Sequence, residues 1–167
     1  KEMAAADALA ILIDPGNLIR TTVTIPEGLR LADIVVLLGK QTDFKAADFQ
    51  KVLDKPGGLG LPEYAEGNAE GYLFPATYDL GPKDTPESIL KTMVDRWKVA
   101  AEEADLEAAA ARLGYTPAEL MIIASLVEAE ARGSDMPKVA RVIYNRLETE
   151  GYPTFGVLEI DATVNYA

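Results

Sequence analysis

The sequence contains neither cysteine nor histidine among its 167 residues. Without these residue types there is no Ser–His or Cys–His nucleophile system, no imidazole proton shuttle and no thiolate or imidazole metal ligand. The acid–base groups that remain are carboxylates, lysines and tyrosines. We therefore expect any catalytic proton transfer to use one of these groups, and we expect neither a metal ion nor another cofactor.

Positive charge and long apolar runs are also scarce. Sixteen Lys and Arg residues stand against 27 Asp and Glu residues, a formal net charge of −11. This balance disfavours nucleic acid or an anionic membrane surface as a partner. No apolar stretch approaches the roughly 18–20 residues that span a bilayer. Because the chain begins at Lys1 rather than Met, we expect it to be part of a longer protein.

Hydrophobic periodicity and turn residues divide the first half of the chain into helices and short extended segments. Helices are predicted over residues 3–13, over 29–39 with an end at Gly39, and from Asp43 or Lys45 onward. The β-branched segment 21–25 (TTVTI) is predicted to be a strand, and the aromatic segment 70–80 is predicted to be extended.

One Gly- and Pro-rich segment is the best candidate for a domain boundary. Residues 55–62 (KPGGLGLP) contain five Gly or Pro in eight positions. We therefore predict a linker there, in a chain of the α+β class. A small α/β module would occupy residues 1–54, and a mainly helical unit with short strands would occupy residues 62–167.

The second half carries two N-terminal capping signatures. Thr85 precedes a Pro, and Thr116 forms a capping box with Glu119. A further helix is predicted over residues 136–149, and the alternating tail 155–167 is predicted to be a strand or hairpin. The helix after Thr85 has an apolar stripe that we expect to be buried, made of Ile89, Leu90, Met93, Val94 and Trp97.

The helix after Thr116 contains an unusual combination of apolar residues and acids. Residues 120–132 read LMIIASLVEAEAR, so Glu128 and Glu130 follow a nearly continuous apolar run. At about 100° per residue, Glu130 shares a face with Ile123, whereas Glu128 lies on another apolar face with Met121. Both faces predict a helix that is buried nearly all round. A glutamate there would lose solvation, which favours the protonated form that a proton donor needs.

A basic residue on the next helix suggests different roles for the two glutamates. Arg146 shares a face with Ile143 and is predicted to be a buried cation that needs an anion. Glu130 would neutralise Arg146 or Arg141, and Glu128 would remain as the unpaired acid. The alternative is that both glutamates are solvated at a helix end, and spacing alone does not decide between the two.

Three segments in this order resemble the YceG-like family of endolytic murein transglycosylases. They are EGYLFPATYDL (70–80), IIASLVEAEA (122–131) continuing into PKVARVIYNRLE (137–148), and LEIDATVNYA (158–167). The resemblance covers about residues 62–167. In the first module, VTIPEGLRLADIV resembles the LysM-like region that precedes the catalytic part of the family. The family commonly has Gln and Pro where this chain has Glu159 and Ala162.

The resemblance implies an activity and a place in the cell. The family cleaves the β-1,4 bond between MurNAc and GlcNAc inside peptidoglycan strands and leaves a 1,6-anhydro-MurNAc end. Its catalytic glutamate matches Glu128. The family also implies a membrane anchor outside this chain, an extracytoplasmic position in the bacterial cell envelope, and cell-wall synthesis proteins as partners. The alternative function is a non-catalytic module that binds glycan or acts as a scaffold.

Five further residues are candidates for substrate binding, and four of them have a structural alternative. Glu70 would orient the substrate or Glu128, or would be a surface charge. Tyr72 would stack on a sugar ring or simply pack in the core. Asn145 would donate a hydrogen bond to the N-acetyl carbonyl or cap a helix end. Thr163 is expected to hydrogen-bond the catalytic carboxyl from a neighbouring strand.

Asp161 has three alternative roles. It would cap the turn before Thr163, position the substrate, or act as the second carboxylate of a lysozyme-like hydrolase. A hydrolase consumes one water per cut, whereas a lytic enzyme consumes none, so the mass of the product separates these alternatives.

Overall fold

The computed structural model describes residues 3–13, 21–149, 151 and 154–166. This part of the chain is mainly helical with one two-stranded sheet, which agrees with the predicted α+β class. The helices and strands are α1 (Ala5–Ile13), β1 (Thr21–Thr24), α2 (Leu31–Gln41), α3 (Ala46–Leu53), β2 (Thr77–Leu80), α4 (Pro86–Glu103), α5 (Leu106–Leu113), α6 (Pro117–Glu130), α7 (Met136–Glu148) and α8 (Asp161–Tyr166). Short 3-10 turns occur at η2 (Pro56–Gly58), η3 (Glu63–Ala65) and η4 (Gly133–Asp135).

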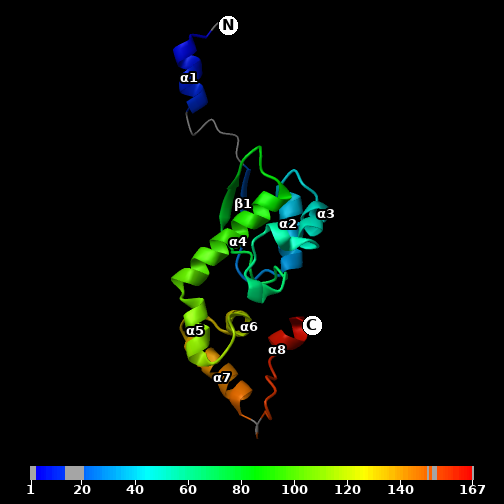
Figure 1. Ribbon diagram of the computed structural model, residues 1–167, viewed down its shortest axis with the longest axis vertical. Helices are drawn as coiled ribbons and strands as arrows, with labels where there is room; N and C mark the ends of the chain where they lie inside the picture. Colours follow the sequence, from blue (N-terminus) through cyan, green and yellow to red (C-terminus); the bar gives the residue numbers. More distant parts are fainter. Residues whose placement is uncertain (1–2, 14–20, 150, 152–153, 167) are drawn as a thin grey trace.

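The molecule is elongated, with its elements grouped along the longest axis (Figure 1). The α1 helix lies at one end, the sheet with α2, α3 and α4 lies in the middle, and α6, α7 and α8 lie at the other end. The α4 helix runs from the sheet toward α5 and so connects the last two groups. Within the described residues, no helix combines the length and the hydropathy needed to cross a bilayer.

The larger core forms around the sheet. The predicted strand at 21–25 is confirmed as β1, which pairs with β2 in antiparallel register, Thr21 opposite Leu80. Val23 is fully buried while the threonines on either side are exposed, because successive side chains of a strand point to opposite faces. The buried residues of this core are Val23, Ile25, Ile34, Val35, Leu38, Phe49, Leu59, Leu73, Tyr78, Leu80, Ile89, Leu90, Met93 and Val94.

The α4 helix supplies the central part of this core. Thr85 caps it as predicted: its hydroxyl accepts from the Ser88 N–H at 3.1 Å, and the Ser88 hydroxyl accepts from the Thr85 N–H at 2.9 Å. The predicted apolar stripe is confirmed, since all five of its side chains are buried. Trp97 at the end of the stripe belongs to a separate aromatic cluster with Tyr72 and Ala65.

The segment predicted as a linker is packed against the first core. Leu59 is fully buried, and the core contains side chains from both sides of residues 55–62. Gly39 also differs from its predicted role, since α2 continues past it to Gln41. A Cβ at Gly39 would lie 2.6 Å from the Ala46 nitrogen, so this glycine permits the close approach of α2 and α3.

The far end of the molecule has a smaller core. The α6 helix is capped by Thr116 as predicted, with the Glu119 N–H donating to the Thr116 hydroxyl at 3.2 Å and the Thr116 N–H donating to the Glu119 carboxylate at 2.8 Å. The helix predicted over 136–149 is confirmed as α7. The buried residues of this second core are Ile123, Leu126, Ile143 and Ile160.

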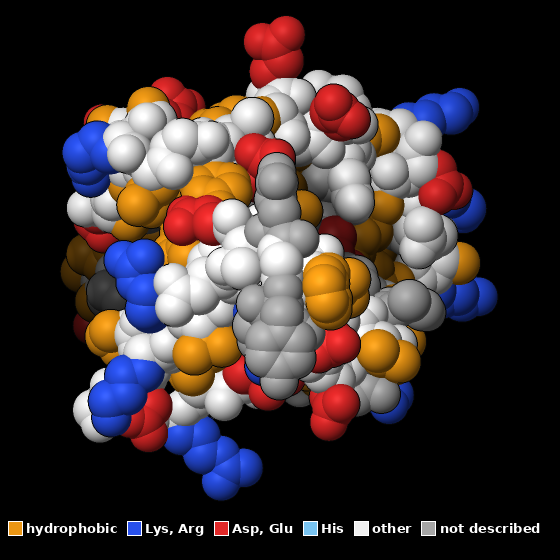
Figure 2. Space-filling model, turned by 90° about the horizontal axis from the view of Figure 1, so that it is seen from below, with side chains coloured by type: hydrophobic (Ala, Val, Ile, Leu, Met, Phe, Trp, Pro, Cys, Tyr) orange, Lys and Arg blue, Asp and Glu red, His pale blue; other side chains and the backbone are white. Residues whose placement is uncertain are grey.

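The prediction that α6 is buried nearly all round is wrong. Ile123 and Leu126 face the second core, but Ile122 is 60% exposed, and Ala124 and Ser125 are also exposed. Among the described elements, α5, α7, α8 and η3 pack against α6 and leave this second face open. Viewed from below in Figure 2, hydrophobic side chains reach the surface of this end between acidic and basic ones.

The predicted strand or hairpin in the tail is also wrong, because residues 161–166 form the α8 helix. The alternating pattern finds no partner strand beside it among the described elements, whose only sheet is β1–β2. The backbone turns at residue 160 instead, where the Thr163 N–H donates to the Ile160 carbonyl at 3.0 Å.

Candidate active site

Glu128 lies in the last turn of α6, beside a hollow of about 420 Å³ between α6 and α7. The α6 helix contributes Ile123, Val127 and Glu128 to its lining, and α7 contributes Pro137, Ala140 and Tyr144. Glu128 is the only acid among the lining residues. The site therefore combines one carboxyl with an apolar surface. This arrangement suits a ligand that has a ring with C–H faces and an atom that can accept a proton.

The carboxyl of Glu128 differs from its predicted environment in one respect. It is exposed, so the burial on which the prediction of a protonated side chain rested is absent from this structure. Within the described residues it has no hydrogen bond and no ion pair. The nearby Ser125 hydroxyl donates to the Ile122 carbonyl at 2.8 Å and not to Glu128. Glu128 is thus unpaired as predicted, but Glu130 is exposed in the same last turn, so the structure favours the alternative that both glutamates are solvated at a helix end.

Glu130 has a structural contact, but not the predicted one. Its carboxylate accepts from the Ala162 N–H at 3.3 Å and so supports the start of α8. Arg146 donates through Nη1 to the carbonyl oxygens of Leu158 and Glu159, the latter at 3.0 Å. The predicted ion pair between Glu130 and Arg146 is therefore wrong, because backbone carbonyls of the segment before α8 take the place of the anion.

The segment before α8 brings these carbonyls together through an unusual backbone conformation. Glu159 has φ of 48°, in the left-handed region that non-glycine residues seldom adopt. The Arg146 guanidinium holds two successive carbonyl groups there, which compensates part of the cost of that conformation. The contribution of residue 159 to this contact is its backbone oxygen, which does not depend on its side chain.

Thr163 and Asp161 lie on α8. The Thr163 hydroxyl donates to the Ile160 carbonyl at 2.6 Å within its own turn, so the predicted hydrogen bond to Glu128 from a strand is wrong. Asp161 is exposed at the first position of α8, and its carboxylate has no hydrogen bond or ion pair within the described part of the chain. The Thr163 N–H, which a cap by Asp161 would have satisfied, donates to the Ile160 carbonyl at 3.0 Å instead.

Glu70 and Tyr72 have partners in the body of the molecule. Both carboxylate oxygens of Glu70 accept from the Leu31 N–H at 3.1 Å, at the N-terminus of α2, where a negative charge is favourable. Tyr72 is 6% exposed, and its ring centroid lies 4.7 Å from that of Trp97. Burial raises the pKa of the Tyr72 hydroxyl. These contacts favour the structural alternative for Tyr72. Neither alternative for Glu70 predicted its contact, since its part-buried carboxylate joins this segment to the start of α2.

Asn145 lies on α7 with an exposed side chain that makes no hydrogen bond within the described residues. It follows Tyr144, which lines the hollow, so it sits on the flank of the site. Pro137 and Ala140 also line the hollow, although neither was predicted as a site residue. Their spacing from Tyr144, at intervals of three and four, marks one face of α7 and would have identified them. The described residues contain no group of three acids arranged to hold a metal ion.

Three solved or curated proteins give the context for this site. The chain is 35% identical to an endolytic murein transglycosylase from Streptococcus pneumoniae serotype 2 (strain D39), over 82% of this chain and 28% of that protein. It is 30% identical to an endolytic murein transglycosylase from Bacillus subtilis (strain 168), over 87% of this chain and 43% of that protein. The chain thus spans less than half the length of these curated relatives.

A YceG-like protein from Listeria monocytogenes has a crystal structure with the same fold. It superimposes with a TM-score of 0.72 at 24% sequence identity, covering 98% of this chain and 57% of that one. The model of the YceG-like family matches residues 1–167, the whole of the sequence. On this match and on the two curated relatives, the chain belongs to the YceG-like family.

Proposed function

We propose that this chain carries the catalytic acid of an endolytic lytic transglycosylase that cleaves the MurNAc–GlcNAc β-1,4 bond and forms 1,6-anhydro-MurNAc ends. The observation that carries the proposal is the position of Glu128, an unpaired carboxyl at the edge of an apolar hollow. Membership of the YceG-like family, whose two relatives above are named endolytic murein transglycosylases, supports the same reaction.

A single carboxyl group performs both proton transfers of this reaction in turn. Glu128 first donates its proton to the glycosidic oxygen as the bond between that oxygen and C1 breaks. The resulting carboxylate then accepts the proton of the C6 hydroxyl as O6 forms its bond to C1. No water is consumed, and the acid returns to its starting form. The N-acetyl group of the substrate stabilises the positive charge at C1, as in substrate-assisted glycosidases.

The exposure of Glu128 gives the substrate a role in preparing the acid. A glycan strand seated on the hollow would cover the carboxyl and exclude water from it. The side chains of Val127 and Ala140 offer an apolar surface for the C–H face of a sugar ring. Asn145 and Asp161, both exposed and without partners in the described structure, are proposed to contact the sugar next to this ring.

The proposed substrate places the enzyme in the bacterial cell envelope, on the extracytoplasmic side. Peptidoglycan strands are then the partner of the site, and cell-wall synthesis proteins are proposed as partners of the whole protein. An anchor outside this chain would hold the protein at the cytoplasmic membrane.

The test replaces Glu128 by Gln in the full-length protein and measures soluble products of purified peptidoglycan by mass spectrometry. We expect anhydro-sugar ends to disappear while folding is retained. Glu130→Gln is the matched control, because an amide oxygen still accepts from the Ala162 N–H and activity should persist. Unchanged turnover in the Glu128 variant would exclude the proposed role.

A non-catalytic glycan-binding function is the second candidate, and the exposure of Glu128 favours it. In that case the unmodified protein would retain glycan strands without releasing any product. Products that are heavier by one water at each cut would instead indicate a hydrolase, with Asp161 as its second carboxylate.

A further inference from the structure

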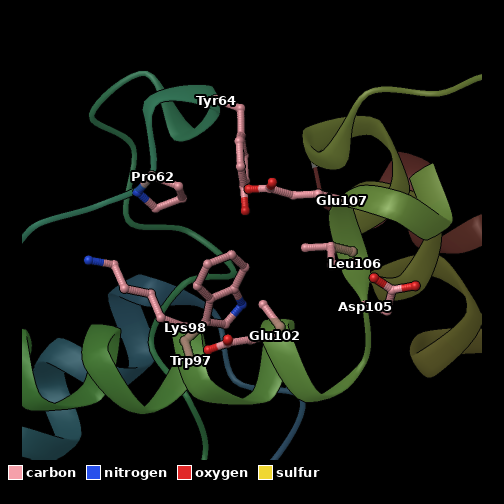
Figure 3. Close-up of a pocket in the computed structure, with 9 residues that line it drawn as sticks. Pro62, Tyr64, Trp97, Lys98, Glu102, Asp105, Leu106 and Glu107 are labelled. Atoms are coloured by element: carbon pink, nitrogen blue, oxygen red, sulfur yellow. The ribbon is translucent and has the colours of Figure 1, made fainter. Parts of the chain in front are cut away.

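A second hollow, of about 410 Å³, lies away from Glu128 between the η3 turn and the junction of α4 with α5. Pro62 and Tyr64 form one side of it, Trp97, Lys98 and Glu102 of α4 form another, and Glu107 of α5 reaches in from a third (Figure 3). Its volume is within the range of small-ligand sites, which is about 300–1,000 Å³.

Trp97 presents an unused hydrogen-bond donor to this hollow. The residue is only 6% exposed, and its indole N–H has no acceptor among the described residues. In Figure 3 the indole nitrogen lies on the side of the ring nearest Glu102 and Leu106. No side-chain nitrogen or oxygen atom of the described residues is both buried and without a partner, so this N–H reaches solvent through the hollow. A ligand that offers an acceptor at this point would take the place of water there.

The hollow has charged groups of both signs. Figure 3 shows the Lys98 ammonium at the left below Pro62, the Glu107 carboxylate beside the end of the Tyr64 side chain, and the Glu102 carboxylate below the Trp97 ring. Within the described residues, none of these three side chains belongs to an ion pair, although the nearby Asp105 is paired with Arg112 at 3.0 Å. The Glu107 charge also contributes to a raised pKa of Tyr64, after the larger effect of burial.

We propose that this hollow binds the peptide that peptidoglycan carries, through a segment with both a free ammonium and a free carboxylate. The ammonium would lie between Glu102 and Glu107, the carboxylate would approach Lys98, and an amide carbonyl would accept from the Trp97 N–H. The rings of Tyr64 and Trp97, with centroids 6.4 Å apart, would cover small apolar side chains of the peptide. A neutral sugar would leave the charges of both signs without partners.

The position of the hollow fits a peptide attached to the sugar at Glu128, so this inference rests on the proposed function. Met121 of α6 packs against the aromatic cluster that includes Tyr64 and Trp97. Glu128 follows Met121 by two helical turns on the same face, a distance of about 10 Å along the axis. A peptide that branches from a sugar bound at Glu128 would run along α6 past Met121 and this aromatic cluster to reach the hollow.

The first experiment uses Trp97, the only tryptophan in the chain, as the reporter. A synthetic tetrapeptide with the composition of a peptidoglycan stem, including a diamino acid with a free side-chain amine, is titrated while indole fluorescence is followed. We expect a saturable change in emission. Acetylation of the peptide amine should weaken binding about tenfold. Equal binding of the acetylated peptide, or no saturable change, would overturn the proposal.

Variants then separate the charged groups. The double variant Glu102→Gln, Glu107→Gln should weaken binding of the free-amine peptide about tenfold and leave binding of the acetylated peptide unchanged. Glu103→Gln is the matched control, because Glu103 is exposed on the same turn of α4 but does not line the hollow. Lys98→Met should weaken the binding of the peptide. The substitution should have no effect on binding when the peptide carboxylate is amidated. A chitooligosaccharide that competes fully for the hollow would contradict the peptide assignment.

These measurements do not depend on cleavage of a glycosidic bond. Glu128→Gln should bind the tetrapeptide as the unmodified chain does, even if it abolishes product formation. Failure of the Glu128 test with retained peptide binding would reject the proposed activity alone. Failure of peptide binding with normal cleavage would reject the peptide site alone.

Discussion

The region around the sheet and the region around α6, α7 and α8 use similar helices but bury them to different extents. The first contains fourteen buried side chains in one cluster, drawn from five elements and the loops between them, whereas the second contains four. Stability is therefore concentrated in the first region. The second keeps apolar side chains near the surface, where the proposed glycan would cover them.

The two capped helices α4 and α6 show the same difference in detail. In α4, the buried residues recur at helical spacing and polar residues fill the other face. In α6, apolar residues occur on every face, but only Ile123 and Leu126 are buried. A periodic stripe thus predicts which face is covered, whereas a uniformly apolar helix does not.

The largest effect is expected from matched cavities in the two cores. Leu90 and Ile143 are both fully buried, one in each cluster. Leu90→Ala should lower the free energy of unfolding by about 2–5 kcal/mol and speed amide exchange throughout the sheet region. Ile143→Ala should cost less, because its partly exposed neighbours can relax into the cavity. Urea unfolding and hydrogen-exchange mass spectrometry measure the effects of both variants. Equal effects on amide exchange in the two regions would contradict the conclusion that stability is concentrated in the first region.

High pH should destabilise the sheet region through Tyr78. Its hydroxyl donates to the Phe74 carbonyl at 2.5 Å, and burial raises its pKa from the usual 10 to about 12. The folded state therefore keeps the proton that the unfolded state loses above pH 10, and stability falls as pH rises from 10 to 12. The expected loss is about 2 kcal/mol. Tyr78→Phe should reduce this dependence of the free energy of unfolding on pH, measured by unfolding at successive pH values. An unchanged dependence would assign the effect to other groups.

A smaller effect is expected where α2 and α3 meet. Gly39→Ala would place a Cβ 2.6 Å from the Ala46 nitrogen, so it should destabilise the chain by about 1–2 kcal/mol despite the higher helix propensity of Ala. Gly57→Ala is the control, because a Cβ there meets no atom within 4 Å. Thermal unfolding compares the two, and a stabilised Gly39 variant would show that the helices can move apart.

The smallest effects should come from the matched helix caps. Thr85→Ala and Thr116→Ala each remove a hydroxyl that accepts from a backbone N–H, at a cost of about 1 kcal/mol. The first should appear in global unfolding. The second should appear mainly as faster exchange at the start of α6, since that helix packs against the smaller core. Global destabilisation by both to the same extent would indicate that the two regions unfold together.

Local signals predicted most elements of the chain. The caps at Thr85 and Thr116 and the β-branched run at 21–25 each act over one or two turns of chain, so they are visible in the sequence. The tail was mispredicted because alternation produces a strand only beside a partner, and here the backbone begins α8 after Ile160.

The candidate site was predicted less completely than the fold. The motif identified Glu128, and helical spacing separated it from Glu130. The partners of Glu130, Glu70 and Arg146 were not predictable, because each is a backbone group at a distance of 12 to 39 residues along the chain. Charge complementarity suggested an ion pair, but a carbonyl or an N–H near a helix end satisfies a charged side chain equally well.

The sequence by itself determined the helix starts, the buried stripe of α4, the strand at β1 and the absence of imidazole and thiol chemistry, because each depends only on residue type and short spacing. Tertiary structure alone decided that Leu59 is buried, that Gly39 is a helix contact, that Glu128 is exposed beside a hollow and that Trp97 lines a second hollow. Those properties depend on which distant surfaces meet, and solvent exposure is fixed by that packing and by nothing local.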